Sequence, residues 1–121
     1  MIPFAHPALL AAITGAEHKL RTRYREIDRA ITKRMGCGAI SPHDGEQVVR
    51  EKKQKRAQTI TWEEYSRMKV IDDALFKYEY EYEALKAVRE KMIRPDMHDN
   101  CLKALHVRLY RLQACIETEK D

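Results

Sequence analysis

Apolar side chains in the second half of the chain recur in alternating steps of three and four residues, in two separate runs. The first run is Ile71, Leu75, Tyr78, Tyr82 and Leu85, and the second is Leu102, Leu105, Leu109, Leu112 and Ile116. This spacing places the side chains on one narrow face of an α-helix and suits the packing of one helix against another. The pattern therefore predicts two long amphipathic helices, over 61–93 and 96–117.

Arg94, Pro95 and Asp96 separate the two runs. Because proline disfavours helical geometry in the residue before it, the chain is expected to turn here and form an antiparallel, coiled-coil-like helical hairpin. At ~1.5 Å per residue, the first of these helices spans ~48 Å, which is longer than a compact domain of this size needs. A second subunit would cover the overhanging apolar surface, so we expect an elongated homodimer.

The helix starts and stops also leave local signals. Thr61 and Glu64 have the spacing of a capping box, in which each side chain bonds the other residue's backbone amide at the start of a helix. An apolar stripe in the first third of the chain predicts a further long helix over 7–34, which Gly36 would end. The stripe consists of Ile13, Ala16, Leu20, Tyr24, Ile27 and Ile31.

The segment 42–58 is the weakest helical signal. Ser41 and Pro42 resemble a helix start, with serine as the cap and proline in the first position. Val48 and Val49 are its only large apolar residues, which is too few to hold it firmly against a core. We expect a weakly attached basic helix or a mobile arm.

These elements predict an all-α fold in a single domain over 1–121. Charged residues make up 35% and aromatic residues 7% of the chain, which suits an extended bundle better than an enzyme with a deep cleft. The start of the chain lacks the basic segment of a secretory signal, and no apolar run approaches the ~20 residues that cross a bilayer. Three cysteines favour reduced thiols, so we expect a cytoplasmic protein with no membrane partner.

Positive charge is concentrated in the first half, where residues 1–60 carry twelve Lys and Arg against six Asp and Glu. Such a bias suits the phosphates of a nucleic acid. The alternative is a solvated surface whose cations pair with Glu26, Asp28 or the acidic third helix. The candidate binding cations are Arg50, Lys52, Lys53, Lys55 and Arg56 in the arm, and Arg21, Arg25 and Arg29 on one face of the first helix.

The aromatic residues divide into expected core and expected surface. Helical spacing places Trp62, Tyr65, Tyr78 and Tyr82 on the apolar face, and Tyr80 on roughly the opposite face. Tyr80 is therefore the exposed aromatic candidate for partner binding, because tyrosine is frequent in binding hot spots. Tyr110 lies just outside the seam of the last helix and is a further interface candidate.

Metal binding and catalysis have little support. His98 with Cys101, and Cys37 with His43, together supply four ligands of the nitrogen and sulfur types that zinc prefers. However, the loop pair is six residues apart and lacks the tight spacing of zinc sites. No nucleophile, base and orienting residue form a recognisable set. We expect no metal, no cofactor and no enzymatic activity.

The sequence thus favours a non-enzymatic helical protein–protein interaction module, such as an adaptor, regulator or inhibitor, that acts through its helix faces. The alternative is a nucleic-acid-associated protein that contacts phosphates with the 50–56 arm and the first helix.

Overall fold

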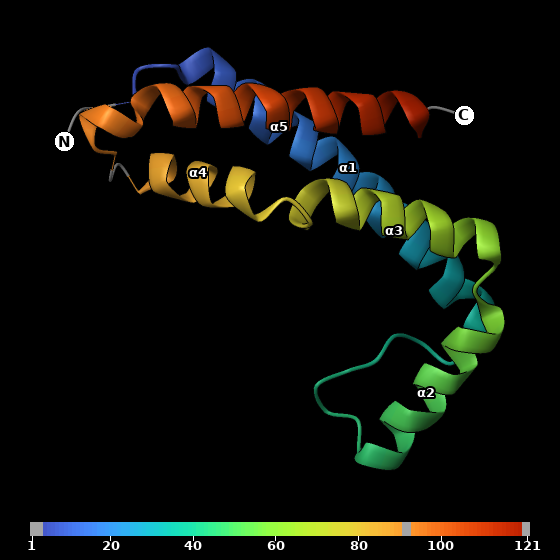
Figure 1. Ribbon diagram of the computed structural model, residues 1–121. Coiled ribbons are helices and arrows are strands. Elements are labelled where there is room, and N and C mark those ends of the chain that lie inside the picture. The colour runs from blue at the N-terminus through green and yellow to red at the C-terminus, as the bar shows by residue number, and fades with distance from the viewer. Residues whose placement is uncertain (1–3, 91–92, 120–121) are drawn as a thin grey trace.

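A computed structural model describes residues 4–90 and 93–119, and every regular element in them is helical. Figure 1 shows their arrangement. In chain order they are α1 (Pro7–Met35), α2 (Glu46–Thr59), α3 (Trp62–Phe76), α4 (Glu79–Arg89), the 3₁₀ helix η1 (Pro95–Met97) and α5 (His98–Thr118). The expected all-α class is confirmed.

Helices α1, α3, α4 and α5 pack into an elongated body, and α2 projects from one end of it (Figure 1). Helix α5 lies in the middle of the packing and contacts α1, α3 and α4. Helix α2 packs mainly against α1 and buries none of its own residues. Val48 and Val49 therefore hold α2 only weakly against the body, as the sequence predicts.

The predicted apolar stripe of α1 forms one side of the core. Ile13, Leu20 and Ile31 are fully buried, and Tyr24 is half-buried. On α5 the seam is shifted from the predicted one, because Leu102, Leu109 and Ile116 are only partly buried. The residues that α5 does bury are Cys101, Ala104, Leu105, Arg108, Leu112 and Cys115.

The single long helix predicted over 61–93 is wrong. Lys77 still has helical backbone angles, but Tyr78 has a φ of −94° and a ψ of 84°. The helix breaks there, so α3 and α4 are separate helices of 15 and 11 residues. The predicted helix also extends too far, because α4 ends at Arg89 and residue 93 is not helical. Without one long overhanging helix, the length argument for a homodimer falls away, and the dimer stays a prediction.

A buried arginine occupies the position where α3 ends. The last four carbonyls of a helix have no partner within the helix, and Nη2 of Arg108 donates to one of them, the Leu75 carbonyl oxygen, at 3.0 Å. The same nitrogen donates to Oε2 of Glu17 on α1 at 2.9 Å. Arg108 and Glu17 are each 1% exposed. One ion pair therefore joins α1, α5 and the end of α3.

The rest of the Glu17 carboxylate is also engaged. Arg89 on α4 donates to Oε1 at 2.9 Å, and the exposed Arg21 lies 3.7 Å from Oε2. In contrast, Nε and Nη1 of Arg108 have no hydrogen-bond partner among the described residues. A buried ion pair stabilises a fold only when both charges are present, because removing one leaves the other desolvated and uncompensated.

The chain connections match the sequence in part. The capping box of Thr61 and Glu64 is confirmed, and Gly36 ends α1 with a φ of +75°. The predicted turn at Pro95 is also present, as η1. Ser41 does not start a helix: its backbone amide donates to Oδ2 of Asp44 at 2.8 Å in a local turn, and α2 begins later, at Glu46.

We predict that Glu17→Gln lowers the free energy of unfolding by about 3–5 kcal/mol, because Arg108 keeps its buried charge and loses its carboxylate. The control is Arg21→Gln, which removes an exposed partner of the same carboxylate and is expected to cost less than about 1 kcal/mol. Urea unfolding followed by circular dichroism measures both values. Equal losses in the two variants would contradict the role assigned to the buried pair.

Candidate functional site

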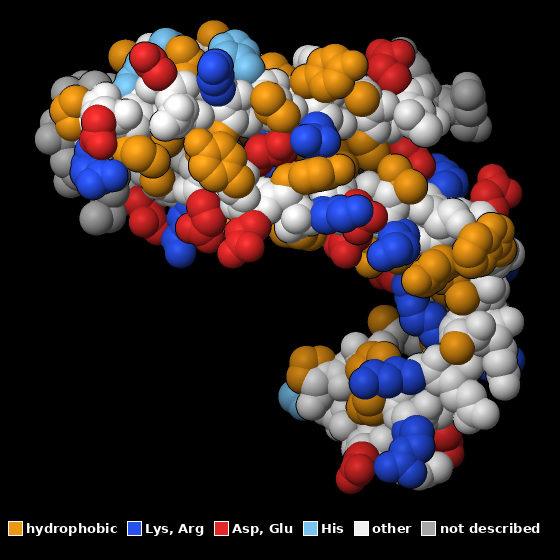
Figure 2. Space-filling view, in the orientation of Figure 1, with side chains coloured by type: hydrophobic (Ala, Val, Ile, Leu, Met, Phe, Trp, Pro, Cys, Tyr) orange, Lys and Arg blue, Asp and Glu red, His pale blue; other side chains and the backbone are white. Residues whose placement is uncertain are grey.

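An apolar groove runs between α3 and α5. It has a volume of about 450 Å³, and its walls include Val70 and Ala74 on α3 and Val107, Tyr110 and Ala114 on α5. Tyr110 is 74% exposed, and Val70 and Val107 are close to half-exposed. Figure 2 shows hydrophobic side chains gathered along the line where these helices meet. Large apolar side chains that meet in one concave surface mark a binding site more often than scattered ones do.

The charged groups beside the groove are paired with one another. Arg111 donates from Nε to Oε1 of Glu81 at 2.7 Å, and its guanidinium carbon lies 3.8 Å from the centre of the Tyr78 ring. The hydrogen bond to Glu81 raises the pKa of Arg111. Lys69 lies 3.9 Å from Asp73 on the other wall. These ion pairs compensate the charges beside the groove, so the surface open to a ligand is mainly apolar.

Cys115 lies at the base of the groove and is 7% exposed. Burial raises the pKa of its thiol. A thiol with a raised pKa carries little thiolate at neutral pH and is a poor nucleophile. The groove is thus suited to binding apolar groups and offers no activated sulfur.

A wider and more polar groove lies between α1 and α5, with a volume of about 1140 Å³. Its lining includes Lys19, Arg23 and Glu26 on α1 and Gln113 on α5. Tyr110 and Ala114 line both grooves, so they form a ridge between the two. A ligand bound in either groove would therefore contact the Tyr110 side chain.

The prediction that four aromatic residues belong to the core is wrong for three of them. Trp62 is 80%, Tyr65 48% and Tyr82 42% exposed, and only Tyr78 is half-buried. Arg67 donates to Glu119, just after the end of α5, at 3.0 Å. Trp62 lies more than one turn before Arg67 on α3, so α5 ends before it could cover Trp62. The expected exposure of Tyr80 is confirmed at 61%, and Tyr110 is exposed as well.

The predicted basic residues of the arm fall into two groups, those that bond other segments of the chain and those that are exposed to solvent. In the arm, Lys52 lies 2.8 Å from Asp44 and also donates to the Ala39 carbonyl oxygen at 3.0 Å, while Arg56 lies 2.6 Å from Asp28 on α1. These two cations hold α2 in place, as the solvated-surface alternative predicts for Asp28. Lys53 and Lys55 are exposed on α2.

The remaining predicted cations belong to α1 and α2, whereas Tyr80 belongs to α4. Arg50 lies 3.3 Å from Glu46 within α2, and Arg21 lies beside Glu17. Arg25 and Arg29 are exposed on α1. The predicted candidates are therefore distributed over three helices, α1, α2 and α4.

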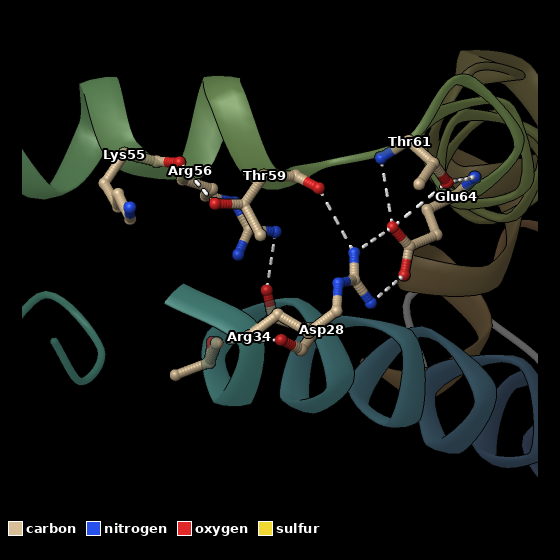
Figure 3. A network of polar contacts seen from close by, with 8 residues as sticks. Asp28, Arg34, Lys55, Arg56, Thr59, Thr61 and Glu64 are labelled. Atoms are coloured by element: carbon tan, nitrogen blue, oxygen red, sulfur yellow. Dashed lines mark hydrogen bonds and ion pairs between the residues drawn. The ribbon is translucent and has the colours of Figure 1, made fainter. Parts of the chain in front are cut away.

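The elbow between α1, α2 and α3 is fixed by a polar network (Figure 3). Arg34 on α1 donates from Nη1 to Oε2 of Glu64 at 2.8 Å, and from Nη2 to the Thr59 carbonyl oxygen at 3.3 Å. Glu64 in turn accepts from the Thr61 amide at 3.0 Å. The hydrogen bond from Arg34, and then that from Thr61, lower the pKa of Glu64 to about 2. This network sets the direction in which α2 leaves the body.

The groove between α3 and α5 was not found from the sequence. Val70 and Val107 lie outside the apolar seams, and a single exposed valine on a helix is an ordinary feature. Their significance depends on which helices pack together, which the seams alone leave open. The signal in the sequence was Tyr110, an aromatic residue just off the seam.

Comparison with known proteins found no matching family model, no significantly similar curated protein and no significantly similar solved structure. Within residues 4–90 and 93–119, no helix has both the length and the apolar character needed to cross a membrane. The same residues contain no group of three or more His, Cys, Asp or Glu side chains arranged to hold a metal ion. Cys37, His43, His98 and Cys101 therefore do not form the four-ligand zinc site considered from the sequence.

We predict that Glu64 contributes to stability at neutral pH and loses this contribution in acid. Its pKa is lower in the folded protein than its ordinary value of 4.5, so the contribution is complete above that value and disappears as the pH falls toward about 2. Glu64→Gln should therefore lower the melting temperature at pH 7, and the difference from wild type should shrink by pH 2.5.

The matched control for this test is Glu63→Gln, a change at the exposed neighbouring residue. Its melting temperature should follow that of the wild type more closely at both pH values. A Glu64→Gln difference that stays constant from pH 7 to pH 2.5 would contradict the assigned ion pair with Arg34.

Proposed function

We propose that this chain is a non-enzymatic protein–protein interaction module, an adaptor or regulator, whose binding site is the groove between α3 and α5. The observation that carries the proposal is the exposure of Tyr110, Val107 and Val70 around one concave apolar surface. Tyrosine is frequent among binding hot spots, and Tyr110 lines this groove.

The chemistry of the groove favours an amphipathic helix of another protein as its occupant. Grooves between two helices bind such helices through apolar side chains at steps of three, four and seven residues. The pairs Arg111–Glu81 and Lys69–Asp73 leave no strong uncompensated charge for an ionic ligand to meet. The contact should therefore be mainly apolar and tolerate salt.

The antiparallel, coiled-coil-like packing of α4 against α5 and the homodimer are part of this proposal. Self-association would use exposed aromatic side chains, which on α3, α4 and α5 are Phe76, Tyr80, Tyr82 and Tyr110. A cytoplasmic protein partner remains the primary expectation.

We predict that Tyr110→Asp abolishes partner binding while it leaves the fold intact, because the side chain is 74% exposed and its replacement puts a charge on an apolar surface. A photo-crosslinking residue at position 107 captures the partner, which is then purified. Isothermal titration at ~50 and ~500 mM salt measures its affinity for wild type and variant.

The control is Trp62→Ser, which removes an exposed aromatic residue that does not line the groove. It should bind the purified partner as tightly as wild type does. Equal affinity of the wild type and Tyr110→Asp would contradict the assignment of the groove, and a strong loss of affinity with salt would contradict its apolar character. Sedimentation equilibrium of the same variants tests the homodimer.

The exposed position of α2 favours nucleic-acid binding as a second candidate function. Helix α2 projects from the body, buries no residue, and carries Lys53 and Lys55 on its surface. Exposed cations on a projecting helix can follow a phosphate backbone without reading its sequence. Lys52 and Arg56 are excluded from the test of this candidate because they hold the arm in place.

If this second candidate is right, the double variant Lys53→Glu with Lys55→Glu should lose affinity for labelled random duplex and single-stranded oligonucleotides. Fluorescence anisotropy at ~50 and ~200 mM salt measures this, a range over which several phosphate contacts lose ~10³-fold in affinity. The control is Lys86→Glu with Lys103→Glu, an equal charge change on the body. Similar affinities of both double variants would contradict a specific role for α2.

A further inference from the structure

Two histidines from opposite ends of the chain meet at the start of α5. His6 precedes α1, and His98 is the first residue of α5. Their Nε2 atoms lie 3.4 Å apart, and their ring centres 5.3 Å apart. Both side chains are partly buried.

This geometry matches two imidazoles bound to one tetrahedral metal ion. With zinc–nitrogen distances near 2.05 Å, the two nitrogens of such a pair lie about 3.4 Å apart, and because both rings tilt toward the ion, their centres lie about 5.2 Å apart. A straight hydrogen bond with the same separation of nitrogens would leave the ring centres about 5.7 Å apart. The observed ring separation is closer to that of the chelating arrangement.

The surroundings of the pair also suit a metal. Nδ1 of His98 lies 3.4 Å from Oδ1 of Asp99. A carboxylate on the second nitrogen is the usual partner of a metal-binding histidine, since it fixes the tautomer and turns the free nitrogen toward the ion. Phe4 packs on both rings, with ring centres at 4.7 Å from His6 and 5.5 Å from His98, and shields one side.

We propose that His6 and His98 bind one divalent transition-metal ion of the zinc class through their Nε2 atoms. Imidazole ligands suit zinc, copper and nickel. No third side chain of the described residues joins the pair, so water or an external ligand fills the other positions. The bound ion links the segment before α1 to the start of α5. This site lies at the opposite end of α5 from the groove and does not depend on it.

The test is isothermal titration of the full chain, without any affinity tag, with zinc chloride. We expect one ion per chain. His6→Gln and His98→Gln should each weaken binding at least tenfold, because either change leaves a single imidazole. Asp99→Asn should weaken it less than either histidine change does, because Asp99 lies beside Nδ1 of His98 but its side chain is 98% exposed.

His43→Gln and His106→Gln are the controls, since both residues are exposed elsewhere and neither contacts the pair. Zinc should raise the melting temperature of the wild type and of both controls, but not of His6→Gln or His98→Gln. His6 lies outside the helices, so its variant should keep the circular dichroism of the wild type. Should His98→Gln fail to fold, His6→Gln alone still decides the matter.

The absence of saturable zinc binding would overturn the proposal. Binding that His43→Gln weakens as much as His6→Gln does would also overturn it, because the ion would then bind surface histidines without selection. One ion per two chains would contradict a site formed within a single chain.

Discussion

Glu17 on α1 and Arg108 on α5 are 91 positions apart in the chain and form an ion pair in the interior of the bundle. Arg108 also donates a hydrogen bond to the Leu75 carbonyl oxygen, where α3 ends. A charge in this position is stable only with its counter-charge. The pair therefore requires α1 and α5 to lie together, and its hydrogen bond satisfies a carbonyl at the break between α3 and α4. Arg89 extends the same contact to α4.

The break in turn shapes the outer surface. Ala74 lies just before the break and Tyr78 lies in it. Both line the groove against α5, so the groove ends where α3 gives way to α4. Arg111 closes that end by packing on Tyr78 and bonding Glu81. The buried ion pair and the end of the apolar groove thus both lie at the break between α3 and α4. At the far end of the body, Arg34 and Arg56 direct α2 outward and leave Lys53 and Lys55 in solvent.

Periodicity predicted the helical class, the stripe of α1 and the turn at Pro95, because each depends on local spacing or local backbone chemistry. It failed at Tyr78, where the spacing is helical on both sides. The break there accompanies a hydrogen bond from Arg108 to the Leu75 carbonyl oxygen, 33 residues away in the chain. Periodicity also assigned Trp62 and Tyr65 to the core, because the spacing of apolar residues along one helix does not tell where the helix packed against it ends. The groove and the pair His6–His98 depend on such contacts between distant residues, so no local pattern could reveal them.

The break between α3 and α4 is the feature that connects the buried pair to the outer surface, and backbone NMR tests it most directly. We expect Cα chemical shifts of the wild-type protein to be helical over Trp62–Phe76 and Glu79–Arg89 and to depart from helical values at Tyr78, since Lys77 keeps helical backbone angles. Helical shifts that continue without interruption through residues 76–79 would contradict the account, because Arg108 would then have no freed carbonyl to bond.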